Sequence, residues 1–287
     1  MAGFKIITAD ERLAEQDGIK GVIFGKYKVG KTSLLHTLDA GTTLFLDLEA
    51  GGLSVQDWRG DSIELRDWPT ARDIACFIGG PNPAMRPDQI YSQAHFNAVC
   101  EKYGNPEMLA KYKTLFIDSI TVASRLAFQW AQGQPDAFSE KTGKADTRGA
   151  YGLLGREMIS WITQLQHVKQ KNVWFVGLLD EKKDDFGRWY FEPQIEGSKT
   201  GLELPGIIDQ VVTMAALSSE DGTQYRAFVC SSPNQWGFPA GDRSGKLEQV
   251  EPPHLGRLME KIRTGSKRNP ASFNYSIETT PEPTIGE

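Results

Sequence analysis

The sequence predicts an α/β fold in which a mostly parallel β-sheet carries helices on both faces and antiparallel strands at its C-terminal edge. Three observations support this class. Short apolar runs alternate with helix-like segments along the chain, as in parallel sheets covered by helices. A glycine-rich phosphate-binding motif joins the first apolar run to a helix-like segment. The last two apolar runs are joined by a short turn, which favours antiparallel pairing.

Each expected element follows from its local pattern. Residues 42–48, TTLFLDL, are almost continuously apolar, which fits a strand buried on both faces. Residues 150–169 repeat apolar side chains at helical spacing, so their Trp and Met residues are expected to belong to the core. The expected strands are 19–24, 42–48, 63–65, 114–118, 173–179, 207–216 and 225–230. The expected helices are 32–39, 69–78, 91–103, 122–132, 150–169 and 255–262.

The chain is expected to consist of an N-terminal arm at 1–17, a core at 18–262 and a disordered C-terminal tail at 263–287. The arm contains a candidate edge strand at 4–7. The tail is rich in Pro, Thr, Ser and Glu and offers little apolar surface, which predicts disorder. Two polar segments, 132–148 and 181–201, are long for loops inside a compact domain, and loops of that length are usually functional.

The composition is that of an ordinary globular protein. The 287 residues are 39% hydrophobic and 24% charged, with a formal net charge of −5. This acidic balance argues against a generally basic nucleic-acid binder, although a local basic groove is compatible with it. No apolar run reaches the roughly 18 residues of a membrane span. The start of the sequence lacks the features of a secretory signal peptide.

The cysteines and histidines give no sign of a disulfide framework or a metal centre. Cys76, Cys100 and Cys230 are scattered and odd in number, which predicts reduced thiols in a cytosolic protein. The four histidines are dispersed and pair with no cysteine at ligand spacing. A zinc site is therefore not expected.

Residues 25–32, Gly-Lys-Tyr-Lys-Val-Gly-Lys-Thr, match the complete G-x-x-x-x-G-K-[ST] pattern of a P-loop. An apolar run precedes the motif and a leucine-rich segment follows it, which is the context that a P-loop needs. We expect Lys31 to reach the β- and γ-phosphates of ATP and the Thr32 hydroxyl to hold Mg²⁺. The predicted nucleotide-binding residues are Gly25, Lys26, Tyr27, Lys28, Val29, Gly30, Lys31, Thr32 and Ser33.

Two acidic residues follow strands that are expected to end beside the P-loop. Asp118 ends the run LFID, and a carboxylate there would hold Mg²⁺ through water. Glu49 lies just beyond the strand 42–48 and would orient the water that attacks the γ-phosphate. Asp47 competes with Glu49 for that role, but its place in the strand favours bonding to the neighbouring backbone. The predicted catalytic residues are thus Glu49, Lys31 and Asp118.

These motifs resemble the core of RecA-type recombinases. The resemblance rests on Asp118-Ser119 after one strand and Asp47-Leu48-Glu49 after another. The resemblance extends to residues 148–152, which are expected to begin a long helix. It also includes residues 197–201 and the strand segment 208–212 that follows them. In its compact size the chain is similar to phage-encoded RecA-like annealing proteins, a group of AAA-type phage nucleotide-binding ATPases. The resemblance covers residues 18–262.

In RecA-like proteins two loops facing the filament axis bind single-stranded DNA, and the resemblance places these loops at about 132–149 and 181–200. The second segment combines cations, which suit phosphates, with aromatic rings, which suit base stacking. Its candidate DNA-binding residues are Lys182, Lys183, Arg188, Trp189 and Tyr190. A β-hairpin with a solvated, charged tip is the alternative interpretation, and the acidic residues of the segment weaken its positive field.

The resemblance also implies that ATP is bound between neighbouring subunits, with a cation of the neighbour reaching the γ-phosphate. Arg243 and Lys246 are candidates for this trans-acting residue, and Lys199 is a third. One departure concerns the strand 173–179, after which recombinases usually carry an amide that senses the γ-phosphate. Here Asp180 and Glu181 follow the strand, and either could take that role.

Three functions are compatible with the sequence. The first is an ATP-dependent protein of RecA type that binds single-stranded DNA and acts in DNA recombination or single-strand annealing, as a filament or ring of identical subunits. The second is a ring ATPase of replication, such as a helicase accessory or loader. The third is a nucleotide-gated module that binds a protein partner. For the first, the resemblance implies a phage protein in the bacterial host cytoplasm, with a single-strand-binding protein as a further partner and no membrane contact.

Overall fold

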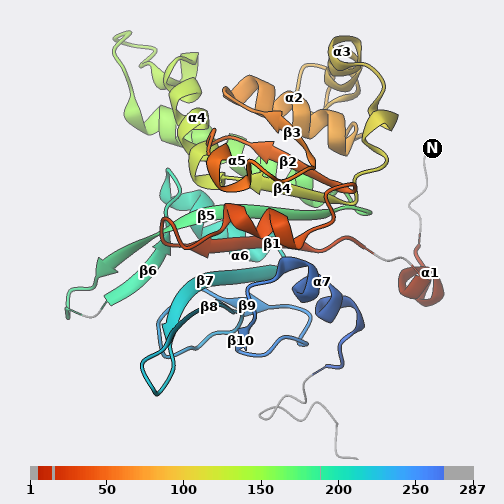
Figure 1. Cartoon of the computed structure of the whole chain (residues 1–287). Coiled ribbons are helices and arrows are strands. Elements are labelled where there is room, and N and C mark those ends of the chain that lie inside the picture. Colours follow the sequence, from red (N-terminus) through yellow and green to blue (C-terminus); the bar gives the residue numbers. More distant parts are fainter. Residues whose placement is uncertain (1–5, 15–16, 188, 268–287) are drawn as a thin grey trace, which may run out of the picture.

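The structure, a computed structural model, describes residues 6–14, 17–187 and 189–267 of the chain (Figure 1). The strands are β1 (Lys20–Gly25), β2 (Thr43–Asp47), β3 (Asp61–Glu64), β4 (Thr114–Asp118), β5 (Asn172–Lys183), β6 (Trp189–Pro193), β7 (Gln210–Ser218), β8 (Gln224–Val229), β9 (Gly241–Asp242) and β10 (Val250–Glu251). The α-helices are α1 (Ala9–Ala14), α2 (Trp68–Gly79), α3 (Gln93–Tyr103), α4 (Ile120–Gln132), α5 (Thr147–Gln166), α6 (Ser198–Ile207) and α7 (Leu255–Thr264). The 3₁₀ helices are η1 (Thr32–Thr37), η2 (Gly52–Val55), η3 (Pro106–Leu109) and η4 (Pro135–Ala137).

The strands form one sheet in the order β10-β8-β7-β1-β5-β4-β2-β3, with β6 paired to β5 and β9 to β7. The six strands from β7 to β3 in this order run parallel to one another. Strands β6, β8, β9 and β10 pair antiparallel. The predicted α/β class is therefore confirmed, and the carboxyl ends of β1, β4 and β2 meet at one edge of the sheet, where ligands bind in open α/β folds.

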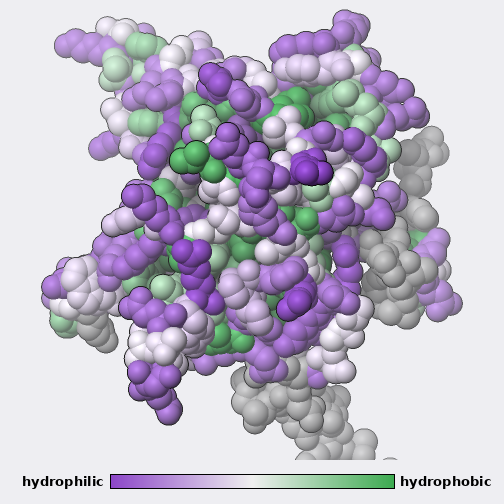
Figure 2. Space-filling model, viewed as in Figure 1, coloured by the Kyte–Doolittle hydropathy of each residue, from purple (hydrophilic) through white to green (hydrophobic). Residues whose placement is uncertain are grey.

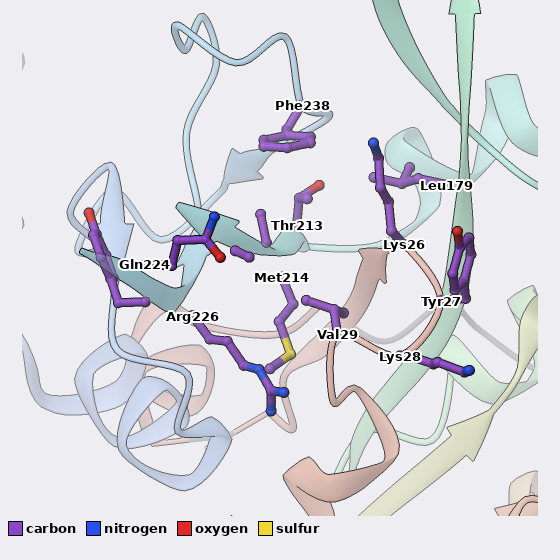
Figure 3. Close-up of a pocket in the computed structure, with 13 residues that line it drawn as sticks. Lys26, Tyr27, Lys28, Val29, Leu179, Thr213, Met214, Gln224, Arg226 and Phe238 are labelled. Carbon is purple, nitrogen blue, oxygen red and sulfur yellow. The ribbon is translucent and has the colours of Figure 1, made fainter. Parts of the chain in front are cut away.

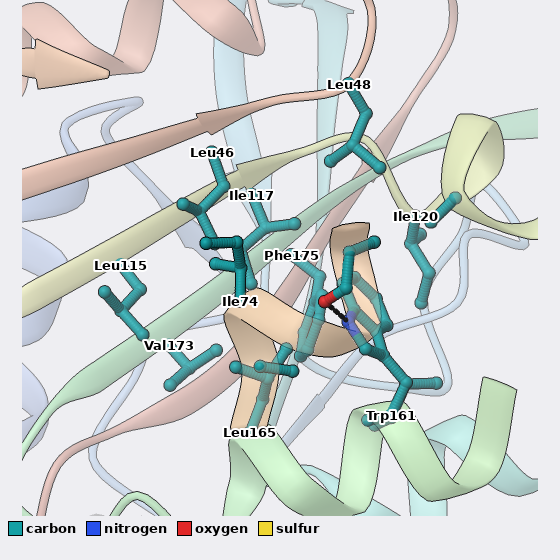
Figure 4. Packing of buried hydrophobic residues seen from close by; sticks show 14 of the residues in the cluster. Leu46, Leu48, Ile74, Leu115, Ile117, Ile120, Trp161, Leu165, Val173 and Phe175 are labelled. Atoms are coloured by element: carbon teal, nitrogen blue, oxygen red, sulfur yellow. Dashed lines mark hydrogen bonds between the residues drawn. The ribbon is translucent and has the colours of Figure 1, made fainter. Parts of the chain in front are cut away.

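Apolar layers lie on both faces of the sheet because successive residues of a strand point to opposite sides. On one face, Leu115 and Ile117 of β4 share a buried cluster with Ile74 of α2 and Leu165 of α5 (Figure 4). On the other face, Phe116 of β4 belongs to a cluster with residues of η1 and α7. Helices thus cover both faces, as predicted.

Helix α5 holds the first of these layers together. Trp161 and Met158 are buried, as the apolar spacing of residues 150–169 predicts. Trp161 donates a hydrogen bond from Nε1 to the backbone oxygen of Ala71 in α2 at 3.0 Å (Figure 4). Its ring also lies 5.6 Å from the ring of Trp68, centroid to centroid. Helix α2 is therefore fixed to α5 by both polar and aromatic contacts.

The segment after the P-loop is shorter than the expected helix 32–39. It forms the 3₁₀ helix η1, which ends at Thr37. The start of α7 abuts this end: the N–H of Leu255 donates to Thr37 Oγ1 at 3.0 Å. A Cβ on Gly256 would stand only 2.5 Å from the backbone oxygen of Thr37. This close contact with α7 accounts for the early end of the helix.

Residues 181–201, expected to form a loop, are largely regular. Strand β5 continues to Lys183, a turn follows, and β6 returns antiparallel with Trp189 opposite Lys183. Gly187 closes the turn with φ of 78°, and its N–H donates to Asp184 O at 2.9 Å. Helix α6 then begins at Ser198. The segment thus forms a β-hairpin, which leaves open whether its tip binds DNA, and the β5–β6 hairpin projects from the body of the molecule (Figure 1).

The two ends of the chain are described only in part. Residues 6–8 form no strand, so the described part of the expected edge strand 4–7 is not a strand; α1 follows it. Residues 1–5 and 15–16 of the predicted arm lie outside the described residues. Helix α7 extends to Thr264, beyond the expected core end at 262. The predicted disordered tail lies outside the described residues from 268 onward.

Hydrophilic residues dominate the face shown in Figure 2, and hydrophobic ones show mainly in recesses between them. Within the described ranges, no helix combines the length and the apolar character that crossing a bilayer requires. Cys76, Cys100 and Cys230 are free thiols. The described part of the chain contains no group of three or more His, Cys, Asp or Glu residues arranged to hold a metal ion.

Candidate functional site

The P-loop curls between the end of β1 and η1, and its backbone is closely packed. A Cβ on Gly25 would stand 2.6 Å from the backbone oxygen of Met214, so only glycine fits there. Gly30 has φ of 100°, a conformation that disfavours every residue with a side chain. Lys31 is buried and donates from Nζ to Gly25 O at 3.0 Å and to Lys26 O at 2.9 Å. The Lys31 side chain thus crosses the inside of the P-loop and binds the backbone at the start of the loop.

The remaining predicted contact residues of the loop are accessible to a ligand. Lys26, Tyr27 and Lys28 are exposed. Val29, Gly30, Thr32 and Ser33 are half-buried. Seven of the nine residues predicted from the motif are thus exposed or half-buried, whereas Gly25 and Lys31 are buried.

Asp118 stands at the end of β4 and contacts the P-loop directly. Thr32 donates from Oγ1 to Asp118 Oδ2 at 2.5 Å. The two residues are 86 positions apart in the chain, and the parallel sheet brings them together. Burial, reinforced by the nearby charge of Glu49, raises the pKa of Asp118 to about 7, against the opposing effects of Thr32 and Lys31. Burial likewise lowers the pKa of Lys31.

Glu49 follows β2 and lies beside Asp118 because β2 pairs with β4, the strand that ends in Asp118. Ser119 donates from its hydroxyl to Glu49 Oε1. The same hydroxyl caps α4 by accepting the N–H of Val122 at 3.2 Å, so it is fixed in position. Glu49 is otherwise exposed, which leaves room for a water molecule. Asp47 accepts the N–H groups of Glu49 and Ala50 at 3.0 and 2.9 Å, which is the backbone role expected of it.

The donor set fits a magnesium ion bound together with nucleotide. Mg²⁺ is commonly held by one or two protein oxygens plus phosphate oxygens and water, and Thr32 and Asp118 offer two such oxygens side by side. A cation bound beside a buried carboxyl whose pKa is raised favours the ionised form of that carboxyl. Mg²⁺, when bound there, would neutralise charge on the phosphates. The role of Glu49 as the group that orients water stays a prediction.

A cavity of about 530 Å³ adjoins the P-loop (Figure 3). It lies on the side of β7 and β8, whereas Asp118 approaches from β4 on the other side of β1. One wall is formed by Lys26 to Val29 of the loop, and the other by the hairpin of β7 and β8. Arg226 of β8 is one of the residues that line the cavity. No motif marks these strand residues, and only the antiparallel pairing of β7 with β8 brings them to the loop.

One of the candidate trans-acting cations, Arg243, lies away from the P-loop of its own chain. Arg243 follows β9, which pairs with the start of β7, at the level of Gly21 in β1. The P-loop begins about 13 Å further along that strand. Arg243 pairs with Asp209 at 3.1 Å, and Lys246 donates to Arg263 O at 2.8 Å. Lys199 of α6 lies 3.7 Å from Glu203. Whether any of these cations contacts ATP of a neighbouring subunit stays a prediction.

The candidate DNA-binding residues lie on the β5–β6 hairpin, except Arg188, which is outside the described residues. Lys182 pairs with Glu192 at 2.6 Å. The Lys183 ammonium lies 4.4 Å from the centre of the Trp189 ring, and that indole is 60% exposed. Tyr190 is also exposed. The structure thus brings cations and aromatic rings together at the hairpin tip; whether they bind DNA stays a prediction.

Two proteins of known structure that are similar to this chain share little sequence with it. An ATPase of the type III secretion system of pathogenic bacteria shares 15% identity with this chain at a TM-score of 0.35. The match covers 69% of this chain, which spans about half (51%) of the secretion ATPase. The RadB recombinase shares 10% identity at a TM-score of 0.34, over 74% of this chain and 88% of that protein. No curated protein matches the sequence.

One family model matches most of the chain. It is AAA_24, an AAA domain, and the match covers residues 17–244, which include the P-loop, Glu49 and Asp118. The sheet agrees with the predicted RecA-like P-loop fold, because its central strands are parallel and its C-terminal strands pair antiparallel. The chain therefore belongs to the AAA_24 family of AAA domains and is a P-loop ATPase.

Proposed function

We propose that this ATPase binds single-stranded DNA and uses ATP hydrolysis to control that binding in recombination or strand annealing. Identical subunits would assemble head to tail, with ATP between them and a cation of the neighbour completing each site. The observation that carries the proposal is a direct link between the P-loop and the β5–β6 hairpin. Lys26 of the P-loop pairs with Glu181 of β5 at 2.7 Å.

The pairing of strands β1 and β5 places the P-loop next to the start of the hairpin. Gly25 at the end of β1 is paired with Leu178 of β5, and Glu181 lies just beyond, where β5 leaves the sheet as the hairpin. The Lys26 ammonium also lies 5.3 Å from the centre of the Phe191 ring on β6. Nucleotide bound to the loop would compete for Lys26, so the hairpin would sense whether phosphate is present. Glu181 thereby takes the sensing role for which the sequence offered Asp180 or Glu181.

The hairpin tip has the chemistry that sequence-tolerant binding to single strands requires. Phe186 is 83% exposed, and Trp189 presents its indole beside the Lys183 ammonium. Exposed rings can stack on bases, and a neighbouring cation can meet phosphates. Seen from outside, the projecting hairpin mixes hydrophilic and hydrophobic residues (Figure 2).

A protein partner is the second candidate, and the charge of the hairpin favours it. Asp184 and Asp185 lie at the turn, and the ammonium of Lys182 already pairs with Glu192. The formal net charge of the whole chain is −5. Such a tip attracts a polyanion only weakly, whereas exposed aromatic rings also suit a protein surface.

The decisive experiment measures ATP hydrolysis with and without single-stranded DNA at several salt concentrations, alongside electron microscopy for filaments or closed rings. DNA-stimulated hydrolysis and binding that weakens steeply with salt support the proposal. Glu181→Gln should keep basal hydrolysis but lose the stimulation, because it breaks the link to Lys26. Glu64→Gln, which breaks an exposed pair with Arg66 on β3, is the matched control and should behave as wild type. Unstimulated hydrolysis without DNA binding would reject the DNA role, and closed rings that separate strands would favour a replication ATPase.

A further inference from the structure

Arg226 lies against the P-loop although it comes from a distant part of the chain. It belongs to β8, opposite Ala216 of β7, and β7 in turn pairs with β1. A Cβ built on Gly30 would stand 2.9 Å from Nη1 of Arg226, so the guanidinium covers this glycine. In Figure 3 the guanidinium end of Arg226 reaches toward the P-loop near Val29 and Met214.

The guanidinium has no carboxylate partner among the described residues, and the side chain is exposed. In this respect it differs from Arg72, Arg156 and Arg243, each of which pairs with an acid. An arginine that is held beside a phosphate-binding loop without a counter-charge is available to an anion. Its planar fork suits two phosphate oxygens at once.

The order of the strands indicates which phosphates Arg226 can reach. Asp118 and Glu49 approach the P-loop from β4 and β2, on one side of β1. Arg226 approaches from β8, on the other side. The phosphate that is cleaved must lie near Asp118 and Glu49, so Arg226 faces the opposite end of the phosphate chain. The 530 Å³ cavity lies on this same side, between the P-loop and the β7–β8 hairpin, and its size suits a nucleoside.

We propose that Arg226 is a nucleotide-binding residue that acts within its own subunit and pairs with the phosphates nearest the ribose. The ribose and base of the bound nucleoside di- or triphosphate occupy the adjoining cavity. The inference rests on the proposed function only in so far as the chain binds nucleotide; it does not depend on DNA. Because ADP and ATP share these phosphates, Arg226 supports the binding of both, and it is not needed for the hydrolytic step itself.

The test uses the full chain and measures binding of ADP and of a non-hydrolysable ATP analogue by calorimetry. Arg226→Ala should weaken the binding of both nucleotides by about 10- to 100-fold, the usual loss for a charge-assisted pair. Arg226→Lys should fall between Arg226→Ala and wild type, because it keeps the charge but loses the fork. The turnover rate at saturating ATP should stay within about twofold of wild type. Arg86→Ala, which removes an exposed arginine paired with Asp88, is the control and should bind as wild type.

The outcomes separate this inference from the proposed function. Wild-type affinity in Arg226→Ala overturns the inference, and so does a loss of turnover with unchanged affinity, which would place the guanidinium at the cleaved phosphate. A weaker affinity that is accompanied by a lower unfolding midpoint without nucleotide also overturns it, because the effect is then structural. A wild-type chain that binds neither nucleotide overturns both proposals. A chain that binds nucleotide through Arg226 but ignores DNA leaves the inference standing and rejects only the DNA role.

Discussion

Replacing Asp118 by asparagine should make the nucleotide-free protein more stable at neutral and alkaline pH. The carboxyl is buried against the P-loop, and its pKa of about 7 in the folded protein compares with 3.8 for an ordinary aspartate. A raised pKa in the folded state means that the protonated carboxyl favours folding. This contribution is complete below about pH 4 and is lost as the pH rises through about 7. Asparagine can still accept the hydrogen bond from Thr32 but never ionises.

The magnitude follows from the two pKa values. Between pH 5 and pH 8, wild type should lose roughly 3 kcal/mol of unfolding free energy relative to Asp118→Asn. Other titrating groups are shared by the two proteins, so they largely cancel in the difference. The assay is denaturant unfolding of both proteins at the two pH values, with a chelator and no nucleotide. Glu64→Gln, at an exposed acid of β3, is the control and should show little pH-dependent difference.

A pH-independent difference between wild type and Asp118→Asn would refute this reasoning, because the carboxylate would then not be destabilised by its site. The expected result would also explain why the site needs a cation. The ionised form of Asp118 destabilises the folded protein when no metal is bound. A magnesium ion requires this ionised form as its ligand. Binding of magnesium and nucleotide should accordingly weaken below about pH 7 in wild type.

The remaining predictions concern the loop, the candidate water-orienting group and the core. Lys31→Ala should abolish nucleotide binding while the folded structure is retained, which calorimetry and circular dichroism together would show; retained binding would contradict the P-loop assignment. Glu49→Gln should bind ATP normally but hydrolyse it slower by about 10²- to 10⁴-fold in single-turnover assays, and normal turnover would exclude Glu49 from the role. Trp161→Ala should destabilise the protein by about 3–5 kcal/mol in denaturant unfolding; a loss under 1 kcal/mol would show that the contact between α2 and α5 is dispensable.

The central features of the site could be predicted because their signals are local. The P-loop motif is contiguous, and Asp118 and Glu49 each follow an apolar run that fits a buried strand. Parallel strands bring their carboxyl ends to one edge, so the approach of Thr32, Asp118 and Glu49 follows from the fold class alone. The same argument placed Trp161 in the core, since helical spacing fixes which face is buried.

The features that could not be predicted depend on long-range pairing. Arg226 reaches the P-loop only because β8 returns along β7 in one particular register, and nothing in the sequence near Arg226 specifies that register. Residues 181–201 were expected to form a loop, with a β-hairpin only as the alternative, because their charged residues obscure the alternation of a strand. The shortness of η1 depends on its contact with α7, more than 200 residues away in the chain. Tertiary contacts override local propensity at each of these places.

The central claim is that the P-loop, Asp118 and Glu49 form one ATP-hydrolysing site. Its most direct test is a single-turnover assay of ATP hydrolysis with magnesium, comparing wild type with Asp118→Asn and Glu49→Gln at saturating ATP. We expect hydrolysis by wild type, with both variants slowed by at least about 100-fold and Glu49→Gln still binding ATP. Hydrolysis at the wild-type rate in either variant would contradict the account.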